Sequence, residues 1–432
     1  MAKHELIVIA MCRDVSPSSP GGPELLAAAA AAPAAPAAAL LLARSAHALS
    51  WAALHAPPRP PSARAIVSLS ACLEAALALA PPRCAAALSS ALRALDGALV
   101  VGGPPHAGGG GSLAAELAAA VEAALPPLPP PASSAPPAEA AAVAAAAAAA
   151  RAAVDAGALL AARFAGAAPP LAPPAATQPS LAAFRALAGA GPVLLRGCFD
   201  HWPALGGGGG ARSWAGLRRL REAAGRRTVP VELCDAEGGY MGPGFGVEMA
   251  PFADFLDACM GAGAGAGGSS LRYLAQHDIF SQIPQLRRDV AVPDYACGGE
   301  GAGEPLLQAW LGPAGTVSNL HWDRARNILV QVVGAKRFRL FPPAAGAALH
   351  AAPPPLENTS LLPVAALREP VPGGEGCAAG ERWAAAFPRY AAGGAGAPME
   401  GVLLPGEGLY IPPGWWHALE ALTPSCSVSC WW

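Results

Sequence analysis

Residues 316–341 narrow the choice of fold more than any other part of this 432-residue chain. They read TVSNLHWDRARNILVQVVGAKRFRLF and contain two β-rich runs, 327–333 and 336–341, joined by Gly334-Ala335. Glycine in the first position of a two-residue loop suits a type II′ turn, so we expect the two runs to pair as a hairpin.

In that hairpin register, Asn327 and Lys336 share one face with apolar neighbours. Lysine is almost never fully buried without a partner, so a lysine facing an apolar interior indicates an anionic ligand. A shift of the register by one residue would instead place Lys336 on the solvent face, and spacing alone leaves both registers open.

His321-Trp322-Asp323 lies just before the two runs. Strand side chains alternate, so His321 and Asp323 are expected on one side, about 7 Å apart along the backbone. One imidazole and one carboxylate are two of the three ligands of the non-haem Fe(II) site built from two histidines and a carboxylate. His417, which follows a Pro-Pro-Gly turn, would complete this set through non-local strand pairing, although a packed structural histidine is the alternative.

The C-terminal part of the chain, from about residue 178, alternates short β-rich segments with Gly/Pro turns. This pattern favours a β core of the cupin or jelly-roll kind, with flanking helices, and therefore an α+β fold. Helices are expected at 180–189, 213–224 and 251–260, and strands at 191–198, 228–233, 271–277, 401–404, 406–419 and 425–432. Residues 342–400 are rich in Pro, Gly and Ala and are expected to be mostly loop.

The first part of the chain, residues 1–174, is dominated by alanine and proline. Alanine runs favour helices and proline runs interrupt them, so we expect a helical, partly disordered N-terminal region before a second domain at 175–432. The uncharged run at 25–43 is long enough to raise the question of a membrane span. It is mostly alanine and contains two prolines, and we expect a soluble segment.

Composition excludes some classes of function and location. A formal net charge of −2 with 13% charged residues argues against a broad nucleic-acid-binding surface. The ten cysteines contain no C-x-x-C pair and no secretory signal precedes them, so reduced thiols and a nuclear and/or cytoplasmic location are expected. Asn358-Thr359-Ser360 fits a glycosylation sequon, which has no meaning without such a signal.

Several ordered segments resemble the JmjC-domain Fe(II)- and 2-oxoglutarate-dependent oxygenases. They are RGCFDHWPAL (196–205), RTVPVEL (227–233), YLAQHDIFSQIPQL (273–286), GPAGTVSNLHWD (312–323), NILVQVVGAKRFRLF (327–341), PGEGLYIPPGWWHALEAL (405–422) and the closing SVSCWW. The resemblance implies a JmjC-type double-stranded β-helix over residues 175–432. The loops at 206–210, 235–247 and 261–268 depart from the family pattern.

The resemblance also implies roles for individual residues. The implied iron ligands are His321, Asp323 and His417. The implied 2-oxoglutarate residues are Lys336, which would pair with the distal carboxylate, Asn327 and Tyr273, with Ser318 and Trp431 as further pocket members. The implied substrate residues are Glu232, Gln276 and Trp310.

The implied activity is hydroxylation of an arginine side chain in a protein, with Fe(II), 2-oxoglutarate and O₂. A carboxylate, an amide and an indole suit a cationic, planar side chain. The alternatives are demethylation of a methylated histone lysine by the same chemistry, a non-catalytic cupin-like binding module, and an RNA-base hydroxylase. The expected partner is a protein or peptide with a cationic side chain, without a nucleic acid or a membrane; the sequence does not indicate the oligomeric state.

Overall fold

The computed structural model describes most of the chain from residue 18 to the C-terminus. The described residues are 18–19, 21–32, 35–55, 61–79, 83–102, 113–128, 170–206, 210–234, 245–260, 271–296, 304–374 and 378–432. The disorder expected within residues 1–174 falls on segments outside these ranges, and the domain boundary at residue 174 stays a prediction.

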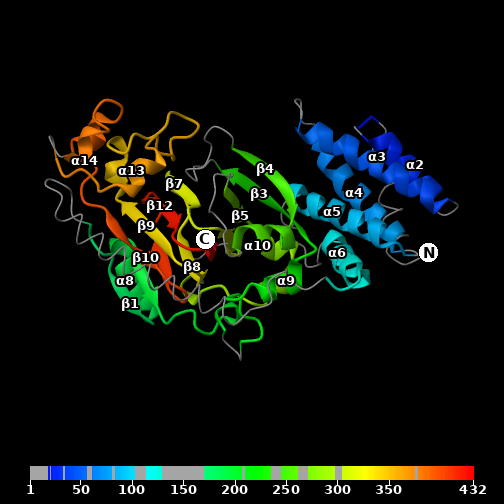
Figure 1. The fold of residues 1–432 in the computed structure, drawn as a ribbon, viewed down its shortest axis with the longest axis horizontal. Coiled ribbons are helices and arrows are strands. Elements are labelled where there is room, and N and C mark those ends of the chain that lie inside the picture. Colours follow the sequence, from blue (N-terminus) through cyan, green and yellow to red (C-terminus); the bar gives the residue numbers. More distant parts are fainter. Residues whose placement is uncertain are drawn as a thin grey trace.

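The described part before residue 129 forms helices that pack together at one end of the molecule (Figure 1). They are α2 (Gly22–Ala31), α3 (Pro36–His55), α4 (Pro61–Ala78), α5 (Ala85–Gly102) and α6 (Leu113–Ala124). Their common core consists largely of alanine, with fully buried leucines such as Leu73, Leu95 and Leu117. The uncharged run at 25–43 is divided between α2 and α3, and none of the described helices has the length and apolar character needed to cross a bilayer.

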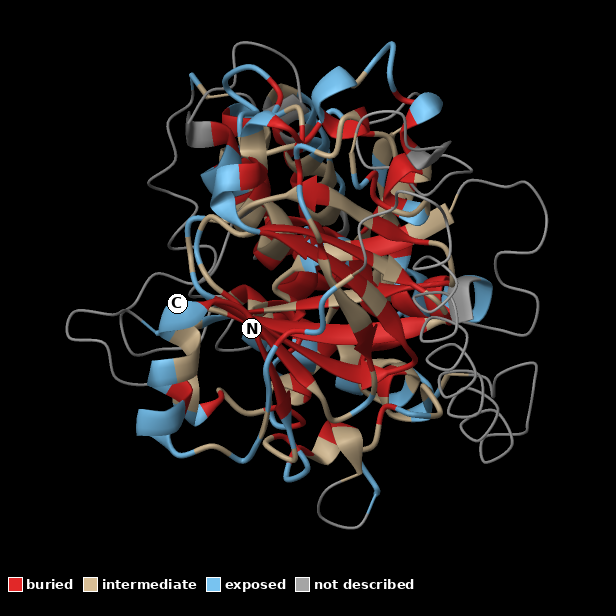
Figure 2. Cartoon of the chain, turned by 90° about the vertical axis from the view of Figure 1, so that its left-hand side faces the viewer, coloured by how far each residue is buried: buried red, intermediate tan, exposed pale blue. Residues whose placement is uncertain are grey.

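Two sheets form the C-terminal domain, as expected for a cupin or jelly-roll core. In Figure 2, buried strands fill the centre and exposed segments lie around them. The larger sheet contains, in spatial order, β1 (Ala175–Thr177), β2 (Val193–Arg196), β11 (Gly408–Ile411), β8 (Asn327–Val333), β13 (Ser425–Trp431), β6 (Leu306–Gly312), β5 (Leu271–His277), β3 (Thr228–Cys234) and β4 (Gly246–Pro251). The smaller sheet contains β10 (Met399–Leu403), β9 (Lys336–Phe341), β12 (Trp416–Ala421) and β7 (Val317–His321).

The expected hairpin between β8 and β9 is wrong, although both strands have the expected bounds. β8 pairs with β11 and β13 in the larger sheet, whereas β9 pairs with β10 and β12 in the smaller one. The Gly334-Ala335 link therefore crosses from one sheet to the other. Two residues of the connection between β12 and β13 hold this link. The Ala335 N–H donates to the Thr423 hydroxyl (2.9 Å), and the Leu422 N–H donates to the Ala335 carbonyl (2.9 Å).

Helices flank the larger sheet. They are α8 (Leu181–Ala190), α9 (Arg218–Ala224), α10 (Phe252–Met260), α11 (Ile279–Gln282) and α12 (Pro284–Arg287). Ser180 caps α8 by accepting a hydrogen bond from the Ala183 N–H (3.2 Å). The helix expected from Ser213 begins only at Arg218, because Leu217 has a left-handed backbone conformation with φ 56°.

Residues 342–400 are less irregular than expected. They contain the 3₁₀ helix η3 (Pro343–Ala347) and the short helices α13 (Val364–Arg368), α14 (Ala378–Glu381) and α15 (Pro388–Ala391). Buried side chains of this segment, including Leu349 and Tyr390, pack with Phe341 and Trp416 of the smaller sheet. The segment thus covers the outer face of that sheet.

The two faces of the larger sheet differ in character. Alternate residues such as Ile328, Val330 and Val428 belong to the large apolar core that includes the flanking helices. The alternating residues of the same two strands, including Asn327 of β8 and Trp431 of β13, point to the other side of the sheet, into the space between the two sheets. This interior between the sheets holds the predicted site.

Candidate metal centre and cosubstrate pocket

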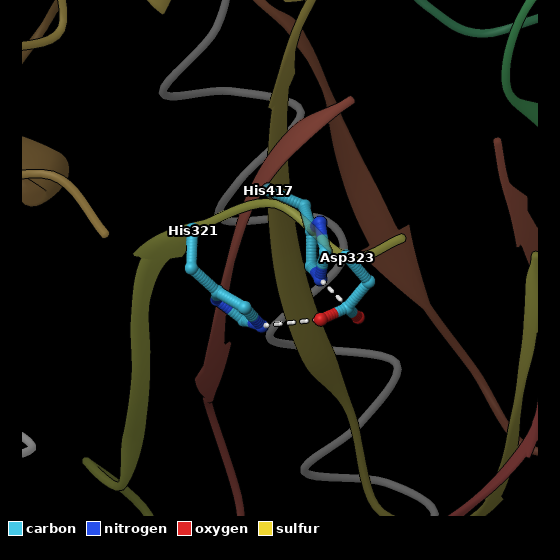
Figure 3. Close-up of side chains that lie close together, drawn as sticks. All are labelled: His321, Asp323 and His417. Carbon is cyan, nitrogen blue, oxygen red and sulfur yellow. Dashed lines mark ion pairs between the residues drawn. The ribbon is translucent and has the colours of Figure 1, made fainter. Parts of the chain in front are cut away.

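His321, Asp323 and His417 converge in the structure as the sequence predicted (Figure 3). His321 ends β7 and lies directly opposite His417 of the antiparallel strand β12. The Asp323 carboxylate lies 3.9 Å from Nε2 of His321 and 3.6 Å from Nε2 of His417. The three ligand atoms lie within 4.8 Å of one another, and no other such group of three was found in the described part of the chain.

Backbone carbonyls orient both imidazoles. Nδ1–H of His321 donates to the Asn319 carbonyl (2.7 Å), and Nδ1–H of His417 donates to the Trp415 carbonyl (3.0 Å). A carbonyl can only accept, so the proton lies on Nδ1 of each ring and the lone pair of each Nε2 is free for a metal.

The electrostatics of the centre favour a metal ion. Burial of His417, together with the neighbouring His321, lowers its pKa to about 4 against the opposing effect of Asp323, so the ring is neutral at neutral pH. Neutral imidazole is the form that binds metals. Oδ2 of Asp323 is buried and accepts no hydrogen bond from any described residue, which is costly unless a cation compensates it. Two imidazoles and one carboxylate fit Fe(II).

An irregularity in β7 brings Ser318 to the same interior as His321. His417 pairs with His321, but Leu419 pairs with Ser318, so β7 has one extra residue between the two pairs. Such a bulge re-aims side chains that strict alternation would separate. Ser318 therefore reaches the Tyr273 hydroxyl and hydrogen-bonds it.

Lys336 lies deep in the interior and extends from the smaller sheet to the larger. It is 2% exposed, and its Nζ donates to the Tyr273 hydroxyl (3.1 Å) and lies 5.5 Å from the centre of that ring. Burial raises the pKa of Tyr273, so this acceptor is neutral, and burial lowers the pKa of Lys336 to about 8. Lys336 is therefore buried, as the interior register required, and a buried ammonium group with a neutral acceptor would suit a carboxylate ligand.

Asn327 and Trp431 lie directly opposite each other on β8 and β13. Oδ1 of Asn327 and the indole N–H of Trp431 are both buried, and neither finds a hydrogen-bond partner among the residues that the structure describes. The unpaired N–H of Trp431 suits a ligand with acceptor oxygens between the sheets. The amide of Asn327 can offer its NH₂ group to the same ligand.

The predicted substrate residues lie beside this pocket. Glu232 of β3 is directly opposite Tyr273 of β5, and burial raises the pKa of its carboxyl to about 7. The Trp310 ring centre lies 6.1 Å from that of Tyr273 and 6.4 Å from that of Trp431. Gln276 is part of a bulge in β5, where two residues oppose Trp310, and its side chain is exposed. The structure thus brings Glu232 and Trp310 next to Tyr273 and leaves Gln276 exposed.

Further polar residues, not predicted from the sequence, lie on this interior face. Ser429 accepts a hydrogen bond from the Trp310 indole (2.9 Å), and Gln308 lies opposite Ser429. Oε1 of Gln308 is buried and, like the atoms above, has no partner within the described ranges. The sequence contained a signal for them. Gln308 is two residues from Trp310, and Ser427 and Ser429 are four and two residues from Trp431, so on a strand each group shares one face.

Comparisons with known proteins agree with this geometry. The model of a family described as "Cupin-like domain" matches residues 180–432. The chain is 36% identical over 245 residues to Jumonji C domain-containing protein 5 of Drosophila melanogaster, which covers 56% of this chain and 54% of that protein. It is also 36% identical over 248 residues to Lysine-specific demethylase 8 of Xenopus tropicalis, a match that covers 56% of this chain and 48% of that protein. Lysine-specific demethylase JMJ30 of Arabidopsis thaliana is 36% identical over 242 residues, which cover 56% of this chain and 49% of that protein. The chain spans about half the length of these curated relatives, and the resemblance expected from its motifs is confirmed.

Proposed function

We propose, since this chain belongs to the Cupin-like domain family, that its C-terminal domain is an Fe(II)- and 2-oxoglutarate-dependent protein oxygenase. The observation that carries this proposal is a triad of two histidines and one carboxylate, positioned in the same interior as a buried lysine. Similarity to proteins of the Jumonji C kind supports it.

The residues of the chain would divide the work between holding the metal and holding the cosubstrate. His321, Asp323 and His417 would hold the ion through two imidazoles and one carboxylate. When bound, Fe(II), 2-oxoglutarate and O₂ together oxidise a substrate C–H bond, while 2-oxoglutarate loses CO₂ and becomes succinate.

Lys336 neutralises the distal carboxylate of 2-oxoglutarate, and the hydroxyl of Tyr273 adds a hydrogen bond. The indole N–H of Trp431 and the amide NH₂ of Asn327, which lies opposite it, would donate hydrogen bonds to the cosubstrate. Fully buried apolar side chains, including Phe338 and Leu340, line the interior and exclude water.

The substrate that fits best is an arginine side chain of a protein. A guanidinium group carries five N–H donors on a flat surface and no acceptor. Glu232 supplies a carboxylate, Gln308 supplies a buried unpaired acceptor in the described part of the chain, and Trp310 supplies a ring for stacking. The reaction we propose is hydroxylation of an arginine C–H bond.

Demethylation of a methylated histone lysine is the second candidate, because four of the similar proteins are named lysine-specific demethylases. Hydroxylation of an N-methyl group would release it as formaldehyde. A non-catalytic binding module is disfavoured, because the three metal ligands and the lysine are all in place.

The mass of the product distinguishes these reactions. Purified protein with Fe(II), 2-oxoglutarate and O₂ is incubated with matched peptides that contain arginine or methylated lysine. We expect the arginine peptide to gain the mass of one oxygen atom, and an Asp323→Ala variant to leave it unchanged. A methyl-lysine peptide that becomes lighter by one methylene, with formaldehyde, would replace the hydroxylase proposal with the demethylase.

A further inference from the structure

The segment 351–361 lies beside the metal centre, although it follows His321 in the sequence by about 30 to 40 residues. The N–H of Ser360 donates to the Leu320 carbonyl (2.8 Å), and Thr359 forms an antiparallel bridge with His321. The segment therefore acts as a short extra strand beside the end of β7, where the first metal ligand lies.

Asn358 makes two hydrogen bonds to Trp322, the residue between the two ligands His321 and Asp323. Its backbone carbonyl accepts from the Trp322 N–H (2.9 Å), and its side-chain Nδ2 donates to the Trp322 carbonyl (3.2 Å). The Trp322 N–H belongs to the peptide group that follows His321, and the Trp322 carbonyl belongs to the peptide group that precedes Asp323. Asn358 thus fixes both peptide planes that connect the two ligands.

The far side of the ligand pair is fixed as well. The Asp323 carbonyl accepts a hydrogen bond from the Gly414 N–H (2.9 Å), in the turn that leads to His417. A backbone hydrogen bond holds this end, and the Asn358 amide adds a side-chain hydrogen bond to the same His-Trp-Asp backbone.

We propose that Asn358 is a positioning residue of the metal centre. Its amide does not belong to the ligand set, but it holds the His-Trp-Asp backbone in the conformation that aims His321 and Asp323 at one point. The inference rests on the metal site of the proposed function and is independent of the substrate. It also gives the Asn-Thr-Ser motif a role in the fold, because Asn358 Nδ2 is engaged with the backbone. Loss of such an outer partner typically weakens metal binding on the order of 10–100-fold.

Direct metal titration tests this role without reference to activity. Asn358→Asp keeps the shape and the acceptors but removes the donor, and Asn358→Ala removes the side chain. We expect both variants to bind Co(II) at least tenfold more weakly than the wild type in calorimetric titrations. Leu361→Ala is the matched control, because this side chain is exposed in the same segment and its loss should leave the affinity unchanged.

A purely structural role would lower the melting temperature of the metal-free protein without changing the Co(II) affinity, and unchanged affinity in folded Asn358→Asp would overturn the proposal. Should both variants fail to fold, Asn358→Ser, which removes the amide that makes this hydrogen bond and leaves a small polar side chain, gives the decisive titration: reduced affinity supports the role, and wild-type affinity overturns it. A wild-type protein that binds no Co(II) would instead contradict the proposed function.

Discussion

Lys336 determines how the pocket should respond to pH. Burial lowers its pKa from 10.5 to about 8, so in the ligand-free protein it loses its proton more readily than a free lysine. A carboxylate binds the protonated form, because only that form is positively charged. The affinity for 2-oxoglutarate is therefore expected to be constant below about pH 8 and to fall above it, by up to tenfold per pH unit.

Calorimetry of 2-oxoglutarate binding to the Co(II)-loaded protein across this pH range measures the effect. Lys336→Arg is the control, because a guanidinium group stays charged and should give an affinity without this decline. The same decline in the arginine variant would mean that another group titrates.

Glu232 should give the opposite pH dependence for substrate binding. Burial raises its pKa to about 7, so the carboxyl is partly protonated at neutral pH and gains its charge as the pH rises through that value. A cationic side chain binds the charged form better, so KM for an arginine peptide should fall several-fold between about pH 6 and pH 8. Glu232→Gln should raise KM and remove this dependence, and an unaltered profile in the variant would exclude Glu232 from substrate binding.

His321, Asp323 and Lys336 could be predicted from the sequence because they lie in one local stretch. His417 could be predicted from the Pro-Pro-Gly turn before it and the family resemblance, although its pairing with His321 is non-local. Asn358 could not, because its role depends on a segment that returns to His321 from almost 40 residues further along the chain. Gln308 escaped notice for a different reason: its alternation with Trp310 indicated a strand face, but only the pairing of β6 with β13 identifies that face as the interior.

At the scale of elements, the bounds of β8 and β9 were correct and their pairing was wrong. A glycine-containing two-residue link is compatible with a hairpin and equally with a crossing between two sheets. The contacts that decide between them come from Thr423 and Leu422, almost 90 residues away. Asn327 and Lys336 nevertheless share one interior, because strands of facing sheets and strands of one hairpin can both point their side chains into it.

Gly312 illustrates how one strand position supports the pocket. A Cβ at this site would lie 2.7 Å from the Tyr273 ring and 3.0 Å from Thr316, so Gly312→Ala should displace Tyr273 and with it the partner of Lys336. We expect a loss of about 1–3 kcal/mol in stability and weaker 2-oxoglutarate binding. Gly246→Ala is the matched control, because nothing lies within 4 Å of its Cβ. Chemical denaturation and calorimetry measure both effects, and equal results for the two variants would refute this role of Gly312.

At the scale of the whole molecule, a buried charge joins the N-terminal helices to the C-terminal domain. Asp96 of α5 is fully buried and accepts hydrogen bonds from the Arg227 guanidinium (2.6 and 2.8 Å), the Thr228 N–H (2.6 Å) and Gln282 Nε2 (2.9 Å). Thr228 begins β3, the strand that also carries Glu232. The composition of residues 1–174 could not reveal this contact, because it joins residues 131 positions apart.

Asp96→Ala leaves the Arg227 charge buried without its partner. We expect a loss of about 3–5 kcal/mol in the free energy of unfolding, measured by chemical denaturation. The control is Glu222→Ala, which breaks the exposed pair with Arg218 and should cost less than about 1 kcal/mol. A small effect of Asp96→Ala would mean that the helices contribute little to the stability of the C-terminal domain.

The most direct measurement is the turnover of 2-oxoglutarate to succinate by the purified protein, with and without Fe(II), alongside Asp323→Ala. The variant removes the carboxylate that lies between the two imidazoles. We predict succinate formation that requires Fe(II) and O₂, increases with an arginine peptide, and falls to background in the variant. Equal succinate in wild type and variant, or none in a wild type that binds the metal, would contradict an oxygenase centred on this triad.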